Sequence, residues 1–134
     1  QCMVIQHMLH QTQLPVSLQI IPTIREPDGL AMSSRNRRLS AEDRIKAVAM
    51  YEQLSAILKQ SGQSSFRQLE TMAIQNLLAA GFWQVDYVSI AEAASLEPAT
   101  DFSFEKQLVV LAAAHLGEVR LIDNMLFPTF AKTT

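Results

Sequence analysis

Cysteine is scarce in this chain, and long apolar runs and internal repeats are missing. Cys2 is the sole cysteine, so no internal disulfide can form, and a stable disulfide to another chain is not expected in a reducing compartment. No run approaches the roughly 18 apolar residues of a membrane-spanning helix. The first residues also lack the charged-then-apolar pattern of a secretory signal. We therefore expect no membrane partner and a cytoplasmic location.

Net charge is small, at a formal −2, and it is unevenly distributed. Six of the eleven basic residues lie between Arg25 and Lys46, which places one basic stretch in an otherwise near-neutral chain. Non-specific binding to nucleic acid needs a broad basic face that neutralises many phosphates. The pattern therefore argues against a nucleic-acid partner and favours a small polyanionic ligand. A small nucleic-acid binder with one basic loop remains an alternative hypothesis.

The chain is long enough for one hydrophobic core. Its 134 residues are 49% hydrophobic and 18% charged, both within the range of ordinary globular domains. A domain of this size buries roughly two-thirds of the surface that its unfolded chain exposes. No second complete domain is required.

The segment from Arg25 to Ser40 reads R-E-P-D-G-L-A-M-S-S-R-N-R-R-L-S, and it combines turn-forming residues with hydroxyl and guanidinium groups. Asp28-Gly29 favours a tight turn. Ser33, Ser34 and Arg35 then place two hydroxyls and a planar guanidinium within three residues. Such groups suit phosphate oxygens, because guanidinium forms bidentate, charge-assisted bonds with them. The alternative reading is an ordinary solvated loop.

Periodicity predicts a helix over Gln1 to Gln13, followed by a buried strand over Val16 to Ile21. Ser40 with Asp43 resembles a capping box and predicts a helix that runs to Gly62. Its apolar stripe is Val48, Tyr51, Leu54 and Leu58.

A second capping box at Ser65 and Gln68 predicts another helix, which ends at Gly81. Its apolar face is Phe66, Leu69, Ala73, Leu77 and Ala80. After Gly81 the pattern changes to three apolar or β-rich runs separated by turn residues. They predict a small antiparallel sheet with strands at Val85 to Ile90, Gln107 to His115 and Val119 to Met125.

The run P-T-I-R-E-P-D-G-L-A-M-S-S-R-N-R-R-L-S closely resembles the C-terminal part of the active site in the pantothenate synthetase (pantoate-beta-alanine ligase) family. Two further segments, from Asp86 to Leu96 and from Ala112 to Asn124, resemble strands of that family's second domain. The family's Met-Ser-Ser-Arg element is the counterpart of the phosphate-binding Lys-Met-Ser-Lys-Ser loop of class I aminoacyl-tRNA synthetases. Its histidine-bearing Met-Gly-x-Leu-His-x-Gly-His segment has no counterpart here, which predicts a C-terminal fragment.

The resemblance implies an α+β fold, in which two helices pack on a small antiparallel sheet, preceded by the last helix and strand of a truncated Rossmann-like domain. Residues 1–24 would be the remnant of that nucleotide-binding α/β domain. Residues 25–39 would form the ATP-phosphate loop and hinge, and residues 40–134 the C-terminal lid domain. A homodimer is implied as well, mainly through the part of the family's sequence not present here.

The resemblance further implies an ATP-dependent ligase that condenses pantoate with beta-alanine through a pantoyl adenylate, with Mg²⁺ as cofactor. Ser33, Ser34 and Arg35 would bind the ATP phosphates and act in catalysis. The backbones of Met32 and Ile24 would contact the adenosine.

Gln1 would be the second of the family's paired glutamines and would contact pantoate. The fragment alone is expected to be inactive, since most of the adenine and pantoate pockets lie outside it. An alternative of another class is a self-associating interaction module without catalysis of its own, with the unpaired strand at Val16 to Ile21 as the contact.

Other candidate residues have ordinary structural explanations. His7 and His10 lack a carboxylate or cysteine at ligand spacing, so we expect no metal site. His115 lies in an apolar run and is expected to be a hydrogen-bonded core residue. Ser33 and Ser34 lack a nucleophile elbow and an evident base, so they are expected to donate hydrogen bonds.

Overall fold

The computed structural model describes residues 1–102 and 106–128. The elements, in chain order, are α1 (Cys2–Thr12), the 3-10 helix η1 (Ser34–Arg38), α2 (Ala41–Lys46), α3 (Ala49–Gln60), α4 (Phe66–Ala79), β1 (Gln84–Glu92), β2 (Leu108–Leu116) and β3 (Val119–Leu126). The strands form one antiparallel sheet in the order β1-β2-β3. This arrangement confirms the α+β class and the predicted strands to within two residues at each end.

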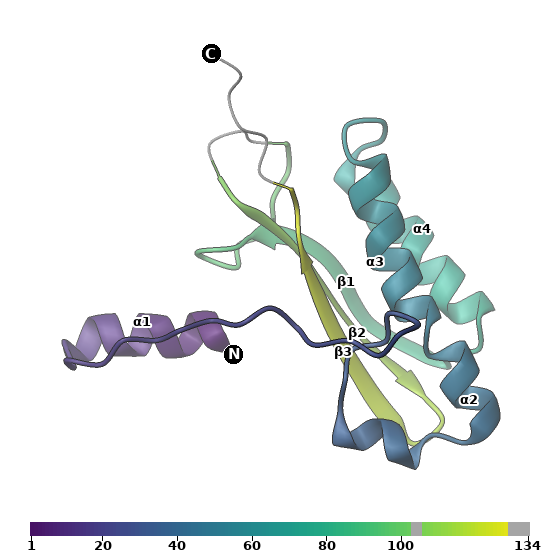
Figure 1. Ribbon diagram of the computed structural model, residues 1–134. Helices are drawn as coiled ribbons and strands as arrows, with labels where there is room; N and C mark the ends of the chain where they lie inside the picture. The colour runs from purple at the N-terminus through teal and green to yellow at the C-terminus, as the bar shows by residue number, and fades with distance from the viewer. Residues whose placement is uncertain (103–105, 129–134) are drawn as a thin grey trace.

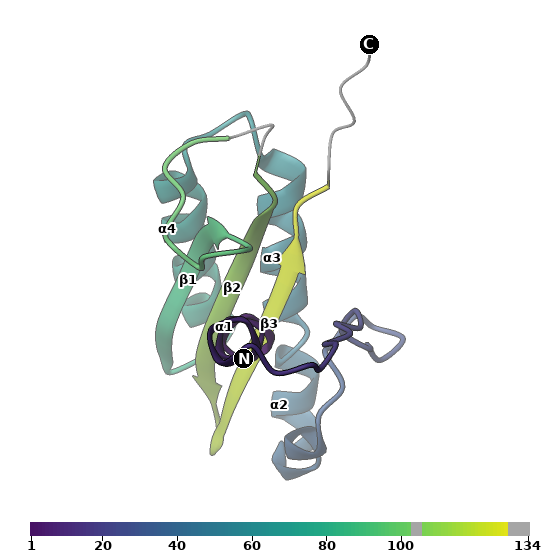
Figure 2. The ribbon, with the colours of Figure 1, turned by 90° about the vertical axis from the view of Figure 1, so that its left-hand side faces the viewer.

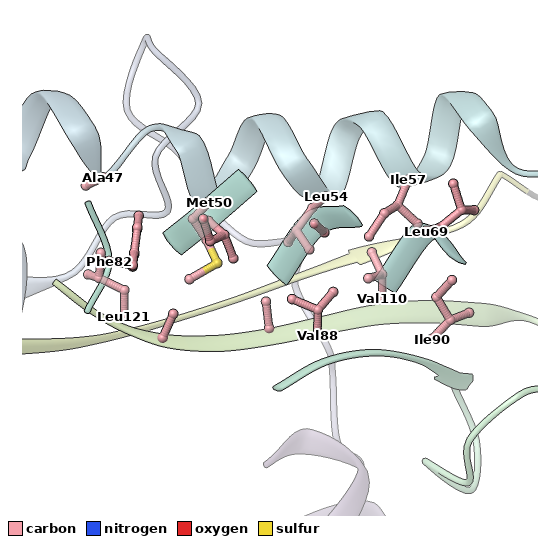
Figure 3. Close-up of a cluster of buried hydrophobic side chains, with 14 of the residues drawn as sticks. Ala47, Met50, Leu54, Ile57, Leu69, Phe82, Val88, Ile90, Val110 and Leu121 are labelled. Atoms are coloured by element: carbon pink, nitrogen blue, oxygen red, sulfur yellow. The ribbon is translucent and has the colours of Figure 1, made fainter. Parts of the chain in front are cut away.

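Helices α3 and α4 cover one face of the sheet, and α1 projects from the opposite side (Figures 1 and 2). The core lies between the two helices and the sheet (Figure 3). Strands β2 and β3 are joined by a tight turn in which Gly117 takes a positive φ of 54°. Each strand alternates side chains between the two faces, so β3 turns Val119 and Leu121 toward the helices and Ile122 toward solvent.

Both predicted helix starts are confirmed by their caps. The Ser40 hydroxyl accepts a hydrogen bond from the backbone N–H of Asp43 at 3.0 Å. At α4, the Ser65 hydroxyl accepts from Gln68 N–H while the Gln68 side chain accepts from Ser65 N–H, so the capping box is complete. The predicted apolar face of α4 is confirmed from Phe66 to Leu77.

The single helix predicted from Ser40 to Gly62 is two helices, α2 and α3. Neither glycine nor proline marks the break, so the cause is tertiary. Asp43 and Lys46 of α2 lie against the glycine turns at Gly117 and Gly81, where a β-carbon would stand 2.8 and 3.2 Å from their side chains.

The buried face of α3 also differs from the predicted stripe. Met50, Leu54 and Ile57 are buried, whereas Val48, Tyr51 and Leu58 of the predicted stripe are only partly so. Leu54 is therefore the one member of that stripe at the centre of the core.

The predicted strand over Val16 to Ile21 is wrong for this chain: the segment is extended but pairs with no strand in the described residues. A strand requires a hydrogen-bonded neighbour, and in the described residues the only sheet consists of β1, β2 and β3. The helix over residues 1–13 is confirmed as α1, although none of its residues is buried. Among the described residues, no helix has the length and apolar character needed to cross a bilayer.

Candidate phosphate-binding site

The base of the loop is a tight turn between two short extended segments. Arg25 and Ala31 form an antiparallel bridge, and Glu26 N–H donates to the carbonyl of Leu30 at 2.8 Å. Gly29 closes the turn with a φ of 95°, a conformation that glycine adopts without strain. The Asp28 carboxylate accepts from Leu30 N–H at 3.2 Å, as turn-forming aspartates do.

Arg25 anchors this turn to the sheet. Its guanidinium donates to both carboxylate oxygens of Asp123 on β3, at 2.7 and 3.0 Å, and also to the carbonyls of Gly29 and Asn124. The same group lies 5.0 Å from the ring centroid of Tyr51 on α3, within cation–π range. Three parts of the molecule that are distant in sequence therefore meet at Arg25.

The tip of the loop has the opposite character, because its donors are not engaged by the described part of the protein. Ser33 is extended and its hydroxyl accepts from Arg35 N–H at 3.2 Å, which starts η1. In the described residues, neither Ser33 N–H nor Ser34 N–H donates to a protein acceptor, and the Arg35 guanidinium makes no ion pair. Ser33, Ser34 and Arg35 are all exposed.

Four of the six predicted site residues line one cleft of about 370 Å³ against the open face of the sheet. They are Gln1, Met32, Ser33 and Arg35. The sheet contributes Tyr87, Arg120, Asp123 and Asn124 to its polar lining. The structure thus brings the start of α1 and the loop tip to the same depression.

The other two predicted residues lie apart from this cleft. Ser34 lines an adjoining depression of about 580 Å³ together with Ser33 and Glu26. Ile24 lines neither; its side chain is 67% exposed, and its carbonyl accepts from Met32 N–H at 2.9 Å. Its backbone oxygen is therefore already engaged within the loop.

Sequence reasoning missed Arg25, Asp123 and Asn36. A detectable pattern existed for Asp123, because β3 alternates inward and outward, and this carboxylate stands at an inward position after Val119 and Leu121. A buried carboxylate needs a cationic partner. Asn36 ties the loop internally by donating to the Ala31 carbonyl at 3.0 Å, while its own side-chain oxygen is buried without a donor in the described residues.

A second charged cluster lies on the open face of the sheet. Arg120 donates to the Asp86 carboxylate at 2.7 Å and thereby lowers the pKa of that carboxyl, with Gln84 as a further donor. His115 stacks against Trp83 at 5.0 Å and lies 3.2 Å from Asp86. His115 is hydrogen-bonded as expected, but it is partly exposed and not a core residue.

A further arginine, Arg44, also contacts the base of the loop. Arg44 pairs with Asp28 at 2.7 Å and lowers the pKa of that carboxyl. Glu42 pairs with Lys46. No group of three or more metal-ligating side chains occurs within residues 1–102 and 106–128.

A sequence model of the family described as Pantoate-beta-alanine ligase matches residues 1–126. The chain belongs to this ligase family. The pantothenate synthetases of Thiobacillus denitrificans and Chromobacterium violaceum are 46% and 47% identical to it, over 93% and 91% of the chain respectively. The crystal structure of pantothenate synthetase from Thermus thermophilus superposes with a TM-score of 0.85 at 34% identity and covers 95% of the chain.

These ligase relatives are longer than the chain. It spans 44% of the length of each of the two curated relatives and 46% of the Thermus thermophilus structure. Fold and family therefore follow from the comparison, while the activity of a complete enzyme requires its own argument.

Proposed function

We propose that the chain supplies the phosphate-binding half of a ligase that joins pantoate to beta-alanine with ATP, releasing AMP and pyrophosphate. One observation carries the proposal: on the rims of two adjoining depressions, the loop tip presents two hydroxyls, together with two backbone N–H groups and a guanidinium that are unpaired within the described residues. Such a set of donors suits a polyanion. The relatives' printed name, pantothenate synthetase, agrees with that use.

The reaction has two steps in this proposal. The carboxylate of pantoate attacks the α-phosphorus of ATP to form pantoyl adenylate and pyrophosphate. The amine of beta-alanine then attacks the activated carbonyl to release AMP and pantothenate. Negative charge builds or moves in both steps, so donors that meet it more fully in the transition state lower the barrier.

Each loop residue has a role in that chemistry. Arg35 neutralises the β- and γ-phosphates as pyrophosphate leaves, and Ser33 and Ser34 donate to phosphate oxygens. The Met32 backbone borders the adenosine. Gln1 lines the same cleft as Arg35, which fits a contact with pantoate bound there.

Ile24 is a weaker candidate for adenosine than the others. Its carbonyl already accepts from Met32 N–H, so any contact with the nucleotide would share that oxygen. A carbonyl oxygen has two lone pairs, which permits such sharing.

Magnesium is the cofactor expected to share the phosphate charge. Asp28 and Asp123 are engaged by arginines, whereas Glu26 lines the depression beside Ser34 and makes no ion pair among the described residues. One carboxylate together with phosphate oxygens is a common way to hold Mg²⁺. Glu26, however, shares its depression with Arg37 and Arg44, so phosphate oxygens rather than this carboxylate would hold the ion, which supplies charge neutralisation when bound.

The function is tested by Arg35→Ala in a complete enzyme. That enzyme is this chain joined to the part of the family's sequence that it does not span, taken where needed from the Thiobacillus denitrificans relative. Loss of one such donor typically slows reaction by about 10² to 10³. We expect a loss of this size in single-turnover adenylate formation, with little change in pantoate affinity.

Arg38→Ala is the matched control, because it removes the same charge three positions away and Arg38 lines neither depression. It should leave adenylate formation within about twofold of the wild type. Adenylate formation at the native rate in the Arg35 variant would defeat the proposal.

The 134-residue chain alone should behave differently from the complete enzyme. We expect no pantothenate synthesis and at best millimolar ATP affinity, about 4 kcal/mol of binding. Calorimetry with ATP and with a short oligonucleotide separates the phosphate site from a nucleic-acid site, since only the latter should show steep salt dependence.

Self-association is the second candidate function. It is favoured by the exposed apolar side chains before Arg25, among them Val4, Val16 and Ile21. The contact would be apolar surface, since no strand forms there to pair edge to edge. Sedimentation of the chain at several concentrations tests this. A homodimer in the cytoplasm is our expectation for the complete enzyme, and the same measurement on that enzyme checks the dimer.

A further inference from the structure

Arg25 differs from the arginines of the loop tip, because both terminal nitrogens of its guanidinium are engaged by protein. It makes four hydrogen bonds, two of them to Asp123, whose side chain is only 2% exposed. The two residues are separated by 98 positions, so this ion pair fastens the loop base to the last strand of the sheet. None of the proposed ligand contacts uses Arg25.

We propose that Arg25 is the positioning residue of the phosphate-binding loop. By tying the Gly29 turn to β3, it fixes the place from which Arg35 reaches the ATP phosphates. The inference rests on the function proposed above and adds to it the device that orients the loop.

The geometry of the tie makes the loop base stiff. A bidentate ion pair fixes the guanidinium plane as well as its position. Gly29 packs so closely against Tyr51 that a β-carbon there would overlap the tyrosine ring, and Arg25 stands over the same ring. The turn therefore cannot shift without breaking contacts to both α3 and β3.

The far end of the loop is tied as well. Asn36 donates to the Ala31 carbonyl, and Met32 N–H donates to the Ile24 carbonyl. Ser33 to Arg35 lie between these ties. Any closing movement over ATP is therefore confined to residues after Met32, and the Asp28-Gly29 turn is the fixed support of that movement.

The position of the Arg35 guanidinium matters because stabilisation of the transition state by a charged group depends on its distance from the reacting atoms. A displacement of about 1 Å, caused by a change remote from the reacting atoms, can slow a reaction by about 10². Arg25→Ala in the complete enzyme should accordingly slow adenylate formation by about 10- to 100-fold. Affinity for pantoate should change by less than about threefold, since none of the proposed pantoate contacts uses Arg25.

A double-mutant cycle distinguishes positioning from general damage. If Arg25 acts through Arg35, then adding Arg25→Ala to Arg35→Ala should slow adenylate formation by less than about twofold further. Arg25→Lys keeps the charge but loses the bidentate bond, and it should show an intermediate loss with a nearly native melting temperature. The matched control is Lys106→Ala, which removes an exposed ion pair with Glu92 and should leave the rate unchanged.

The outcomes separate this inference from the proposed function. Full additivity of the Arg25 and Arg35 losses, or a native rate in Arg25→Lys and Arg25→Ala alike, overturns the positioning role even when Arg35→Ala is slow. A native rate in Arg35→Ala overturns the proposed function itself. Should Arg25→Ala fail to fold, the Arg25→Lys and Arg35→Ala pair yields the same cycle.

Discussion

Residues 1–24 and the body that begins at Arg25 differ in charge and in burial. The first region contains no Asp, Glu, Lys or Arg, and none of its residues is buried. The body carries all of those charges and contains every buried residue of the described chain, from Leu30 onward. Figure 1 shows the same division, with α1 standing apart from the packed helices.

The difference teaches that an apolar pattern needs a partner before it becomes a core. The apolar residues of α1 have helical spacing and form a helix, yet Val4 and Met8 stay at least half exposed. In α3, Leu54 has the same kind of spacing and is completely buried because the sheet lies against it (Figure 3). Uncharged, apolar and exposed surface of this kind typically marks a contact with other protein.

Truncation of one apolar side chain in each region gives the largest contrast. Leu54→Ala leaves a cavity in the core and should lower the free energy of unfolding by about 3 kcal/mol. Met8→Ala should lower it by less than about 0.5 kcal/mol, since Met8 is half exposed. Denaturant unfolding of the 134-residue chain measures both, and equal losses would mean that α1 is packed in solution.

Arg25 stands at the boundary, so its removal tests whether the body begins there. Arg25→Ala leaves the Asp123 carboxylate buried without its cation and should cost about 3 kcal/mol of stability. The exposed pair of Lys106 with Glu92 is the control, and Lys106→Ala should cost less than about 1 kcal/mol. Thermal and denaturant unfolding check this. A loss of stability in Arg25→Ala no larger than that of the control would show that the Arg25–Asp123 ion pair does not stabilise the body.

Two glycines with similar backbones measure how tightly the loop base is packed. Gly29 and Gly62 have φ of 95° and 87°, but only Gly29 faces a neighbour, the Tyr51 ring, which an added β-carbon would overlap. Gly62→Ala should cost about 1 kcal/mol from backbone strain. Gly29→Ala should cost about 1 to 3 kcal/mol more from overpacking. Similar unfolding midpoints for the two variants would show that the loop base and the Tyr51 ring move apart at little cost in free energy.

The smallest expected effect is the loss of stability in acid, and it concerns an ion pair of the body. Hydrogen bonding to Arg120 lowers the pKa of Asp86 below its ordinary value of 3.8. A lowered folded-state pKa contributes stability above the unfolded pKa, and that contribution is lost as pH falls through the folded pKa. As the pH falls from about 5 to about 2, the free energy of unfolding of Asp86→Asn should therefore decrease less than that of the wild type.

The pH measurement has an internal control in the partner residue. Arg120→Ala should remove the same component of acid sensitivity, and the double variant should lose no more than either single one. Unfolding followed across the pH range decides this. Unchanged acid sensitivity in both variants would exclude the pair as a source of stability.

Local rules were enough to predict most of the body. The caps at Ser40 and Ser65 and the alternation of β3 act within a few residues, so the sequence displays them. The break before α3 depends on residues that are distant in sequence. The unpaired state of Val16 to Ile21 depends on whether a neighbouring strand is present. Local patterns encode neither of these.

The loop tip could be predicted from the sequence because its residues are consecutive, whereas its anchor could not because it joins distant residues. Ser33, Ser34 and Arg35 are consecutive, so their donors are visible as a motif. Arg25 anchors the loop only through its ion pair with Asp123, and a single sequence does not show which residues so far apart are paired. The inward position of Asp123 on β3 was the one local hint.

Hydrogen exchange of the complete enzyme, with and without ATP, tests the central claim that a free donor set on a fixed base binds the triphosphate. The amides of Glu26, Gly29 and Leu30 in the turn should be protected without ATP, because they are already hydrogen-bonded. The amides of Ser33 and Ser34 should exchange quickly alone and slow at least tenfold, about 1.4 kcal/mol, when ATP is added. Unchanged exchange at Ser33 and Ser34 with ATP bound would contradict the account.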